Sequence, residues 1–169
     1  MSRYKRFTRE CRLEQLKPAL LDAVRKHLAA RGLADEEAQV VMCCETVSER
    51  QPATGLSALV KEDTDEIYYT SALFTPQWLV WARSSEKSGT AVVSARLKEI
   101  RVKPFASLLV SDAGLEVIGY VGDPGARVSG YIGLGAEAAA QKFCEAVRRA
   151  VDKANPPRSL LDVFTFKPR

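Results

Sequence analysis

The sequence has very little histidine, and its few cysteines are poorly spaced for metal binding. Its 169 residues include one histidine, His27, and four cysteines, Cys11, Cys43, Cys44 and Cys144. The cysteines form no C-x-x-C pair, and Cys43 and Cys44 would point to opposite faces of a strand. We therefore expect no metal site, and we interpret the cysteines as largely buried thiols in a reducing compartment.

Long apolar runs are also absent from the sequence. No stretch approaches the roughly 18 apolar residues that a membrane-spanning helix needs. The opening MSRYKRFTRECRLEQ is basic but lacks the apolar core of a secretion signal. We therefore expect a cytoplasmic protein with no transmembrane segment.

The residues do not assemble into a recognisable catalytic set. His27 is flanked by Lys26 and Leu28 in a helical pattern, which favours a solvated surface residue, and no G-x-S-x-G element presents a serine. The acidic stretch KEDTDE at 61–66 lacks the spacing of a calcium loop. We expect no catalytic residues and interpret the chain as something other than an enzyme.

Charge is distributed unevenly along the chain. Residues 1–31 hold nine Lys and Arg against three acidic residues, whereas residues 35–66 hold nine acidic residues against two basic ones. A polyanion would bind the front of the chain in preference to its middle.

The front of the chain has the periodicity of an amphipathic helix. Leu13, Leu16, Leu20, Val24 and Leu28 recur at three- and four-residue steps and form one apolar stripe. Pro18 places the start of the main helix near itself, with Leu13 and Leu16 in a separate preceding turn. Gly32 is a suitable stop.

Beyond Gly32 the pattern changes to short β-branched and aromatic segments separated by turn signals. The segments are QVVMCCETVSE, TGLSALVK, EIYYTSALF, WLVWARS, TAVVSARLKEIRV, SLLVSD and LEVIGYVG. Strands in sequence with tight connections predict an antiparallel meander. Whether residues 39–49 form a strand or a helix stays open at this point. One amphipathic helix follows, with Ala136, Ala140, Phe143, Val147 and Val151 on one face.

The stretch YIGLGAEAA raises the question of a dinucleotide site. Gly133, Gly135 and Ala138 have the spacing G-x-G-x-x-A, but a dinucleotide-binding turn opens a βαβ unit and needs a second parallel strand with an acidic residue. Here the preceding strand ends a meander, and little chain follows the helix. We expect no cofactor, and we interpret the glycines as letting the last strand turn sharply and bring the helix close to the sheet.

Two stretches carry a resemblance to the pleckstrin-homology-like superfold. In LFTPQWLVWARS, Thr75 would open a turn between two strands, and Leu79 to Trp81 would follow it. AEAAAQKFCEAVRRAV resembles the closing helix of that superfold, with Phe143, Ala146, Val147, Ala150 and Val151 at the apolar positions. The likeness covers about residues 40–155 and implies strands closed by one C-terminal helix.

The chain departs from the superfold in two ways. The closing aromatic residue is Phe143 where eukaryotic members have tryptophan, and the first hairpin loop carries Glu62, Asp63, Asp65 and Glu66 where phosphoinositide-binding members carry cations. The lipid-headgroup role therefore does not transfer to this chain, and bacterial members would be the closer relatives.

We predict an α+β, β-rich fold: an antiparallel meander forming a partly open barrel or sandwich, closed by a C-terminal helix, with an extra N-terminal helix. The expected divisions are a basic segment with its helix at 1–34, the pleckstrin-homology-like domain at 35–155, and a Pro-Pro linker with a short tail at 156–169. The expected function is a non-catalytic interaction module that binds a protein partner or itself, through an exposed sheet edge and the tail strand VFTF.

The alternative is peripheral binding to anionic membrane lipid through the basic front segment. Nucleic acid is disfavoured, because no aromatic residues interleave with the cations of ARLKEIRVK. The candidate interaction residues are Arg3, Lys5, Arg6, Arg9, Arg96, Lys98, Val163, Phe164 and Phe166.

Overall fold

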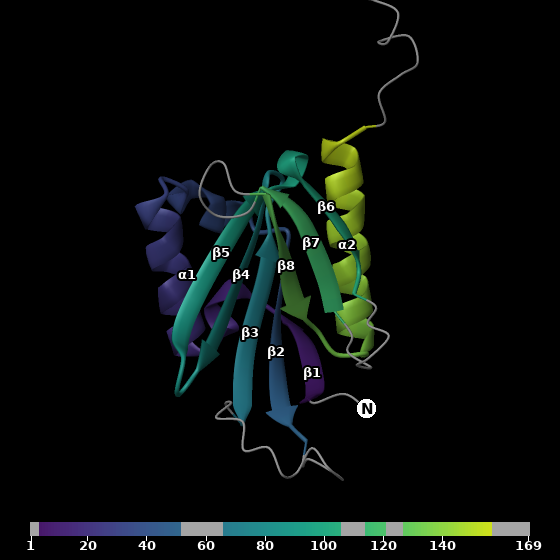
Figure 1. Ribbon diagram of the computed structural model, residues 1–169. Coiled ribbons are helices and arrows are strands. Elements are labelled where there is room, and N and C mark those ends of the chain that lie inside the picture. The colour runs from purple at the N-terminus through teal and green to yellow at the C-terminus, as the bar shows by residue number, and fades with distance from the viewer. Residues whose placement is uncertain (1–3, 52–65, 106–113, 121–126, 157–169) are drawn as a thin grey trace, which may run out of the picture.

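The computed structural model describes residues 4–51, 66–105, 114–120 and 127–156, which form two antiparallel sheets and two helices (Figure 1). The five strands of the first sheet are β1 (Tyr4–Cys11), β2 (Met42–Arg50), β3 (Ile67–Phe74), β4 (Trp78–Ser85) and β5 (Gly89–Arg96), in that order. The second sheet contains β6 (Ile100–Pro104), β7 (Gly114–Tyr120) and β8 (Arg127–Gly133). The helices are α1 (Pro18–Ala30) and α2 (Ala138–Ala154).

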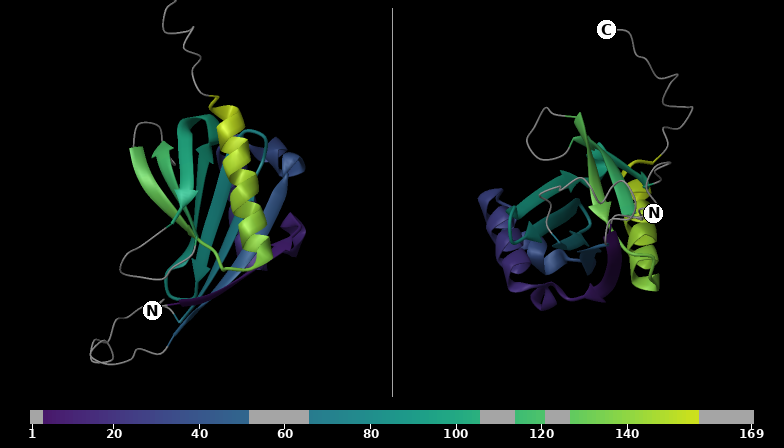
Figure 2. Two further views of the ribbon diagram at one scale, coloured as in Figure 1. Left: turned by 90° about the vertical axis from the view of Figure 1, so that its right-hand side faces the viewer. Right: turned by 60° about the horizontal axis from the view of Figure 1, so that its bottom comes forward.

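This arrangement confirms the predicted fold class. The described chain is α+β and strand-rich, every strand pair is antiparallel, α1 lies between β1 and β2, and α2 ends the order. The two sheets face each other without closing into a barrel within the described residues, as the right-hand view of Figure 2 shows.

Helix α1 covers one face of the five-stranded sheet. It begins at Pro18 after a separate 3-10 turn at Leu13–Gln15, as the sequence predicts, and Gly32 follows it with a φ of 67°. Its buried stripe of Leu20, Val24 and Leu28 packs with Leu13 and Leu16 on side chains of β2, β3 and β4.

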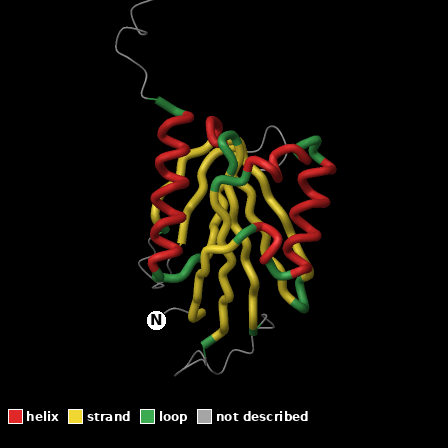
Figure 3. The backbone as a smooth tube through the Cα atoms, turned by 180° about the vertical axis from the view of Figure 1, so that it is seen from behind, coloured by secondary structure: helices red, strands yellow, loops and turns green. Residues whose placement is uncertain are grey.

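Helix α2 closes the space between the two sheets on the opposite face. Its stripe of Ala140, Phe143, Val147 and Val151 is buried, and Phe143 meets Phe74 edge to face at 6.0 Å between ring centroids. The core on this side contains side chains from both sheets and from α2. Figure 3 shows the two helices on opposite sides of the strands.

Strand β4 separates these two cores by simple alternation. Leu79 and Trp81 join the core between the sheets, whereas Val80 joins the core under α1 and Trp78 packs against it. The preceding turn opens with Thr75, as the sequence predicts. Its hydroxyl oxygen accepts hydrogen bonds from the N–H groups of Gln77 (3.3 Å) and Trp78 (3.1 Å), and its hydroxyl donates to the buried Glu36.

The structure resolves residues 39–49 in favour of a strand. A 3-10 helix at Ala34–Gln39 precedes β2, which begins at Met42. Cys43 lies in the core under α1 and Cys44 in the core between the sheets, so the two thiols point to opposite faces.

The sequence pattern does not predict strand β1. Tyr4–Cys11 pairs along its whole length with β2, from Tyr4 opposite Arg50 to Cys11 opposite Cys43. The segment YKRFTREC is highly charged and has few β-branched residues, so its composition does not indicate a strand. Its cations therefore belong to an ordered edge strand.

The segment TAVVSARLKEIRV, which the sequence predicts as either an exposed edge strand or a strand broken near Glu99 and Ile100, forms two strands. A 3-10 turn at Leu97–Glu99 divides the segment, so β5 ends at Arg96 in the first sheet and β6 begins at Ile100 in the second. The buried side chains of Leu97 and Ile100 fix this crossing point, because both pack in the core between the sheets.

Glu45 joins β1, β2 and the start of α1. One carboxylate oxygen accepts a hydrogen bond from Arg9 on the neighbouring strand (2.9 Å), and the other accepts one from the backbone N–H of Lys17, which precedes α1 (2.6 Å). The carboxylate is buried, and it satisfies an N–H group that the helix itself leaves unpaired.

We expect Glu45→Ala to lower the free energy of unfolding by about 2–4 kcal/mol, because it removes two hydrogen bonds to a charged group. Urea denaturation followed by circular dichroism measures this loss. Glu14→Ala is the control, since Glu14 is exposed nearby and its loss should cost less than about 0.5 kcal/mol. Equal effects of the two substitutions would contradict the role given to Glu45.

Candidate functional site

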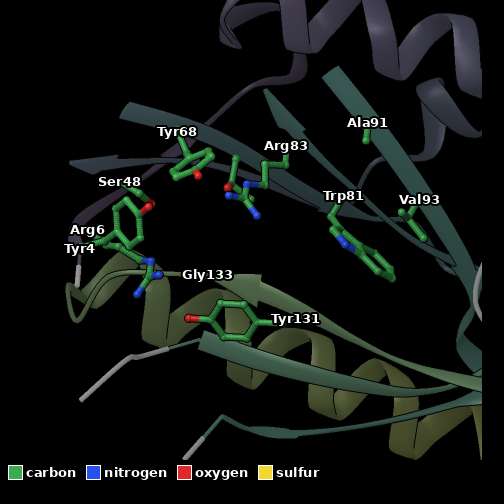
Figure 4. Close-up of a pocket in the computed structure, with 11 residues that line it drawn as sticks. Tyr4, Arg6, Ser48, Tyr68, Trp81, Arg83, Ala91, Val93, Tyr131 and Gly133 are labelled. Atoms are coloured by element: carbon green, nitrogen blue, oxygen red, sulfur yellow. The ribbon is translucent and has the colours of Figure 1, made fainter. Parts of the chain in front are cut away.

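A cleft of about 410 Å³ opens between the inner face of the five-stranded sheet and strand β8 (Figure 4). Side chains from all five strands of the first sheet line one wall, and Tyr131 and Gly133 of β8 line the other. Its volume lies in the usual range for small-molecule sites. The cleft is larger than two other pockets of the described chain, which measure about 220 and 330 Å³.

Strand alternation and register bring the lining together. Arg6 lies opposite Ser48, which lies opposite Tyr68, and these three side chains share the inner face of β1, β2 and β3. One row further along the strands, Thr70 lies opposite Arg83. Each contributing strand therefore places every second residue in the cleft.

The two arginines of the cleft lie against aromatic rings. The Arg83 guanidinium carbon lies 3.7 Å from the centroid of the Tyr68 ring. The corresponding carbon of Arg6 lies 5.7 Å from the ring centroids of both Tyr4 and Tyr131. Tyr4 and Tyr68 in turn meet edge to face at 5.2 Å. These cation–π contacts orient both guanidinium groups at the cleft.

The described lining of the cleft carries positively charged side chains. Arg6 and Arg83 line it, and its lining residues within the described chain include no aspartate or glutamate. Ser48 and Thr70 add hydroxyl groups that can donate hydrogen bonds. Low-dielectric walls around charges of one sign concentrate the field, and a lining of this kind favours negatively charged ligands.

The glycines before α2 allow β8 to approach the five-stranded sheet closely. A Cβ at Gly130 would lie 2.9 Å from the Trp81 ring, and a Cβ at Gly133 would lie 2.9 Å from Nε of Arg6. The N–H of Gly135 donates to the Thr8 hydroxyl at 2.7 Å, and the Glu137 carboxylate accepts from the Thr8 N–H at 3.0 Å. The entry to α2 is thus bound to β1, and the glycines also set the width of the cleft.

The candidate interaction residues named from the sequence lie at different places in the structure. Arg6 lines the cleft, whereas Lys5 and Arg9 lie on the opposite face of β1, where Arg9 pairs with Glu45. Arg96 stacks over Trp78 at 5.1 Å, and with Lys98 it lines a smaller pocket of about 220 Å³ beside Ala154. Arg3, Val163, Phe164 and Phe166 lie outside the described residues.

Most residues of the cleft are missing from the sequence-based set. Tyr4, Tyr68, Trp81, Arg83 and Tyr131 enter it only through the register of the strands. One signal is visible in the sequence: Y-K-R at Tyr4 and W-A-R at Trp81 each place an aromatic residue and an arginine two positions apart. In a strand that spacing puts both side chains on one face.

The expectation of a solvated His27 is wrong. Its Nε2 shares a hydrogen bond of 2.9 Å with the hydroxyl of Ser94 on β5, and the ring is partly buried. Burial lowers the pKa of His27, and the nearby Arg31 lowers it further. Ser94 is 1% exposed, so this pair joins α1 to the sheet and offers no open site to a substrate.

Comparison with protein family models, curated proteins and solved structures finds no significant match to this chain. In the part of the chain that the structure describes, no helix is long and apolar enough to cross a membrane. The chemistry of the cleft is therefore the basis on which a function can be argued.

We expect Gly130→Ala to lower the free energy of unfolding by about 1–3 kcal/mol, because the new methyl group would overlap the Trp81 ring. Thermal or urea denaturation measures the loss. In a Trp81→Leu background the same substitution should cost clearly less, since the overlapping ring is gone. An equal loss in both backgrounds would contradict the close contact between β8 and β4.

Proposed function

We propose that the chain is a non-catalytic binding module and that the cleft between the sheets binds a ligand with negative charge. The observation that carries this proposal is the lining itself: two arginines and no acidic residue among the described lining residues. The rings of Tyr4, Tyr68 and Tyr131 hold the guanidinium groups in place before a ligand arrives. Such preorganisation reduces the entropic cost of binding.

The same lining favours binding over catalysis. Acid–base chemistry needs a group whose pKa lies near the operating pH, and histidine, carboxylates and cysteine are the usual sources. The described lining supplies arginine, tyrosine, serine and threonine. These groups can donate hydrogen bonds to a bound anion.

We retain the pleckstrin-homology-like resemblance as a proposal about ancestry. Antiparallel strands followed by a closing helix agree with what it implies, and Phe143 occupies the buried centre of that helix. Strand β1 and helix α1 would be additions to the superfold. We also propose a cytoplasmic location, which the four free cysteines support.

Membrane binding through the basic front segment has less support. Arg6 and Arg9 point to opposite faces of β1, and the Arg9 side chain pairs with Glu45. A flat anionic surface would need the cations on one face. Sedimentation with anionic vesicles tests this alternative.

An anionic aromatic dye tests the cleft. We expect anilinonaphthalene sulfonate to bind the folded protein with increased fluorescence, and Arg83→Gln and Arg6→Gln each to weaken binding about tenfold, equivalent to about 1.4 kcal/mol. Added salt should weaken binding as well. Arg101→Gln is the matched control, because Arg101 is an exposed strand arginine outside the cleft. If both cleft variants bind the dye as the unmodified protein does, the cleft is not the anion site.

A second candidate function is binding of a protein strand at the edge of β5. In the described chain β5 has β4 as its strand neighbour and ends the sheet, and Gly89, Thr90 and Ala91 are exposed. An open edge of this kind can accept an added strand. We propose Val163–Phe166 of a second copy as that strand, because VFTF is short, β-branched and aromatic.

Under this second proposal the full chain should self-associate through its tail. We expect sedimentation velocity to show a concentration-dependent dimer, and deletion of Ser159–Arg169 to leave a monomer. A full-length variant with Asn at Val163, Phe164 and Phe166 is the control for chain length and should also be monomeric. A dimer that survives the deletion would exclude the tail as the added strand.

A further inference from the structure

The cleft has one polar end and one apolar end. At the polar end, the inner-face row of Arg6, Ser48 and Tyr68 is followed by the row of Thr70 and Arg83. The next row contains Trp81 opposite Val93, and it adjoins the core between the sheets. Figure 4 shows Trp81 and Val93 at one end of the cleft and Tyr4 and Arg6 at the other.

The apolar end remains part of the open cleft. Val93 is only partly buried and lines the cleft with Trp81, and the exposed Ala91 lies next to it on the same face of β5, opposite Arg83. An inorganic anion at the arginines would leave these surfaces in contact with water. A ligand with an apolar body would cover them and gain the free energy of burying both surfaces.

The positions of the cations locate the charged group of such a ligand. Arg6 lies on β1 and Arg83 on β4, so their backbones are about 14 Å apart across the sheet. The Arg83 guanidinium reaches back over Tyr68 on β3, which brings it toward the strands between the two arginines. An acid group over Ser48 and Thr70 therefore lies between two guanidinium groups and beside two hydroxyl donors.

We infer that the ligand is an amphipathic organic anion, with a carboxylate or phosphate group between Arg6 and Arg83 and an apolar body against Trp81, Ala91 and Val93. This inference rests on the proposed function and adds an apolar body to the negatively charged ligand. Both acid groups match the planar fork of arginine, so the recognition chemistry is shared between them.

The fluorescence of Trp81 provides a direct test. The chain has two tryptophans, and Trp78→Phe leaves Trp81 as the only one, on the cleft side of the sheet. Acetate, butanoate, hexanoate, octanoate and octyl phosphate are titrated into this variant. Octanol supplies the apolar body without the charge, and inorganic phosphate supplies the charge without the body.

We expect affinity to rise up to about fourfold per added CH₂ along the carboxylate series until the cleft is filled. Octanol should bind at least about tenfold more weakly than octanoate, and Arg83→Gln should abolish that difference. Val93→Asn should weaken octanoate and leave acetate unchanged. Arg101→Gln should alter none of these values, and thermal unfolding checks that each variant is folded.

The outcomes separate this inference from the proposed function. Arginine-dependent binding with no dependence on chain length would overturn the amphipathic ligand and leave an anion site. Equal affinity for octanol and octanoate, or no binding of any probe, would overturn both. If Arg83→Gln also abolishes sedimentation with phosphatidylglycerol vesicles, the anion is a membrane lipid; binding of the free acids without vesicle binding identifies a soluble acid. Either result supports the inference.

Discussion

The close approach of β8 to the five-stranded sheet is the constraint on which the cleft depends. A Cβ atom at Gly130 would contact the Trp81 ring, and a Cβ atom at Gly133 would contact the Arg6 side chain. Residues with a Cβ at these two positions would force the sheets apart or displace Trp81 and Arg6. The apolar core ends at Trp81, and the polar half of the cleft begins where the two sheets are no longer joined by apolar contacts. The two sheets thus pack closely at Trp81 and leave the cleft open toward Arg6.

The two helices cover different faces of the five-stranded sheet. Helix α1 buries the outer face, where Leu73 and Val80 pack beneath it, and Glu45 and the His27–Ser94 hydrogen bond attach it at different points. Helix α2 closes the inner side through Phe143 and is tied to β1 by Glu137. Because both faces of the central strands are buried, β4 is apolar at nearly every position in its first half.

Local patterns in the sequence predict most elements but not the site. The stripe ending at Leu28, the stop at Gly32 and the turn at Thr75 each depend on residues close together in the chain, and the structure confirms them. Strand β1 is hidden by its charge. The break at Leu97–Glu99 depends on tertiary packing of Leu97. The cleft combines Arg6, Arg83 and Tyr131, whose proximity depends on pairing registers that no local pattern contains.

Strand alternation determines which charges of the basic front segment and the acidic middle segment lie next to each other. On the outer face of the sheet, Lys5 lies opposite Glu49 and Arg9 opposite Glu45, so cations of the basic front segment face acids of the acidic middle segment. On the inner face, the neighbours of Arg6 and Thr8 are Ser48 and Thr46, which carry no charge. One register therefore pairs outer-face charges with each other and places Arg6 between uncharged neighbours on the inner face. A shift of β1 by one residue would exchange its two faces and place Lys5 and Arg9 on the cleft side in place of Arg6. The register of β1 on β2 thus determines both the pairing of Arg9 with Glu45 and the presence of Arg6 in the cleft.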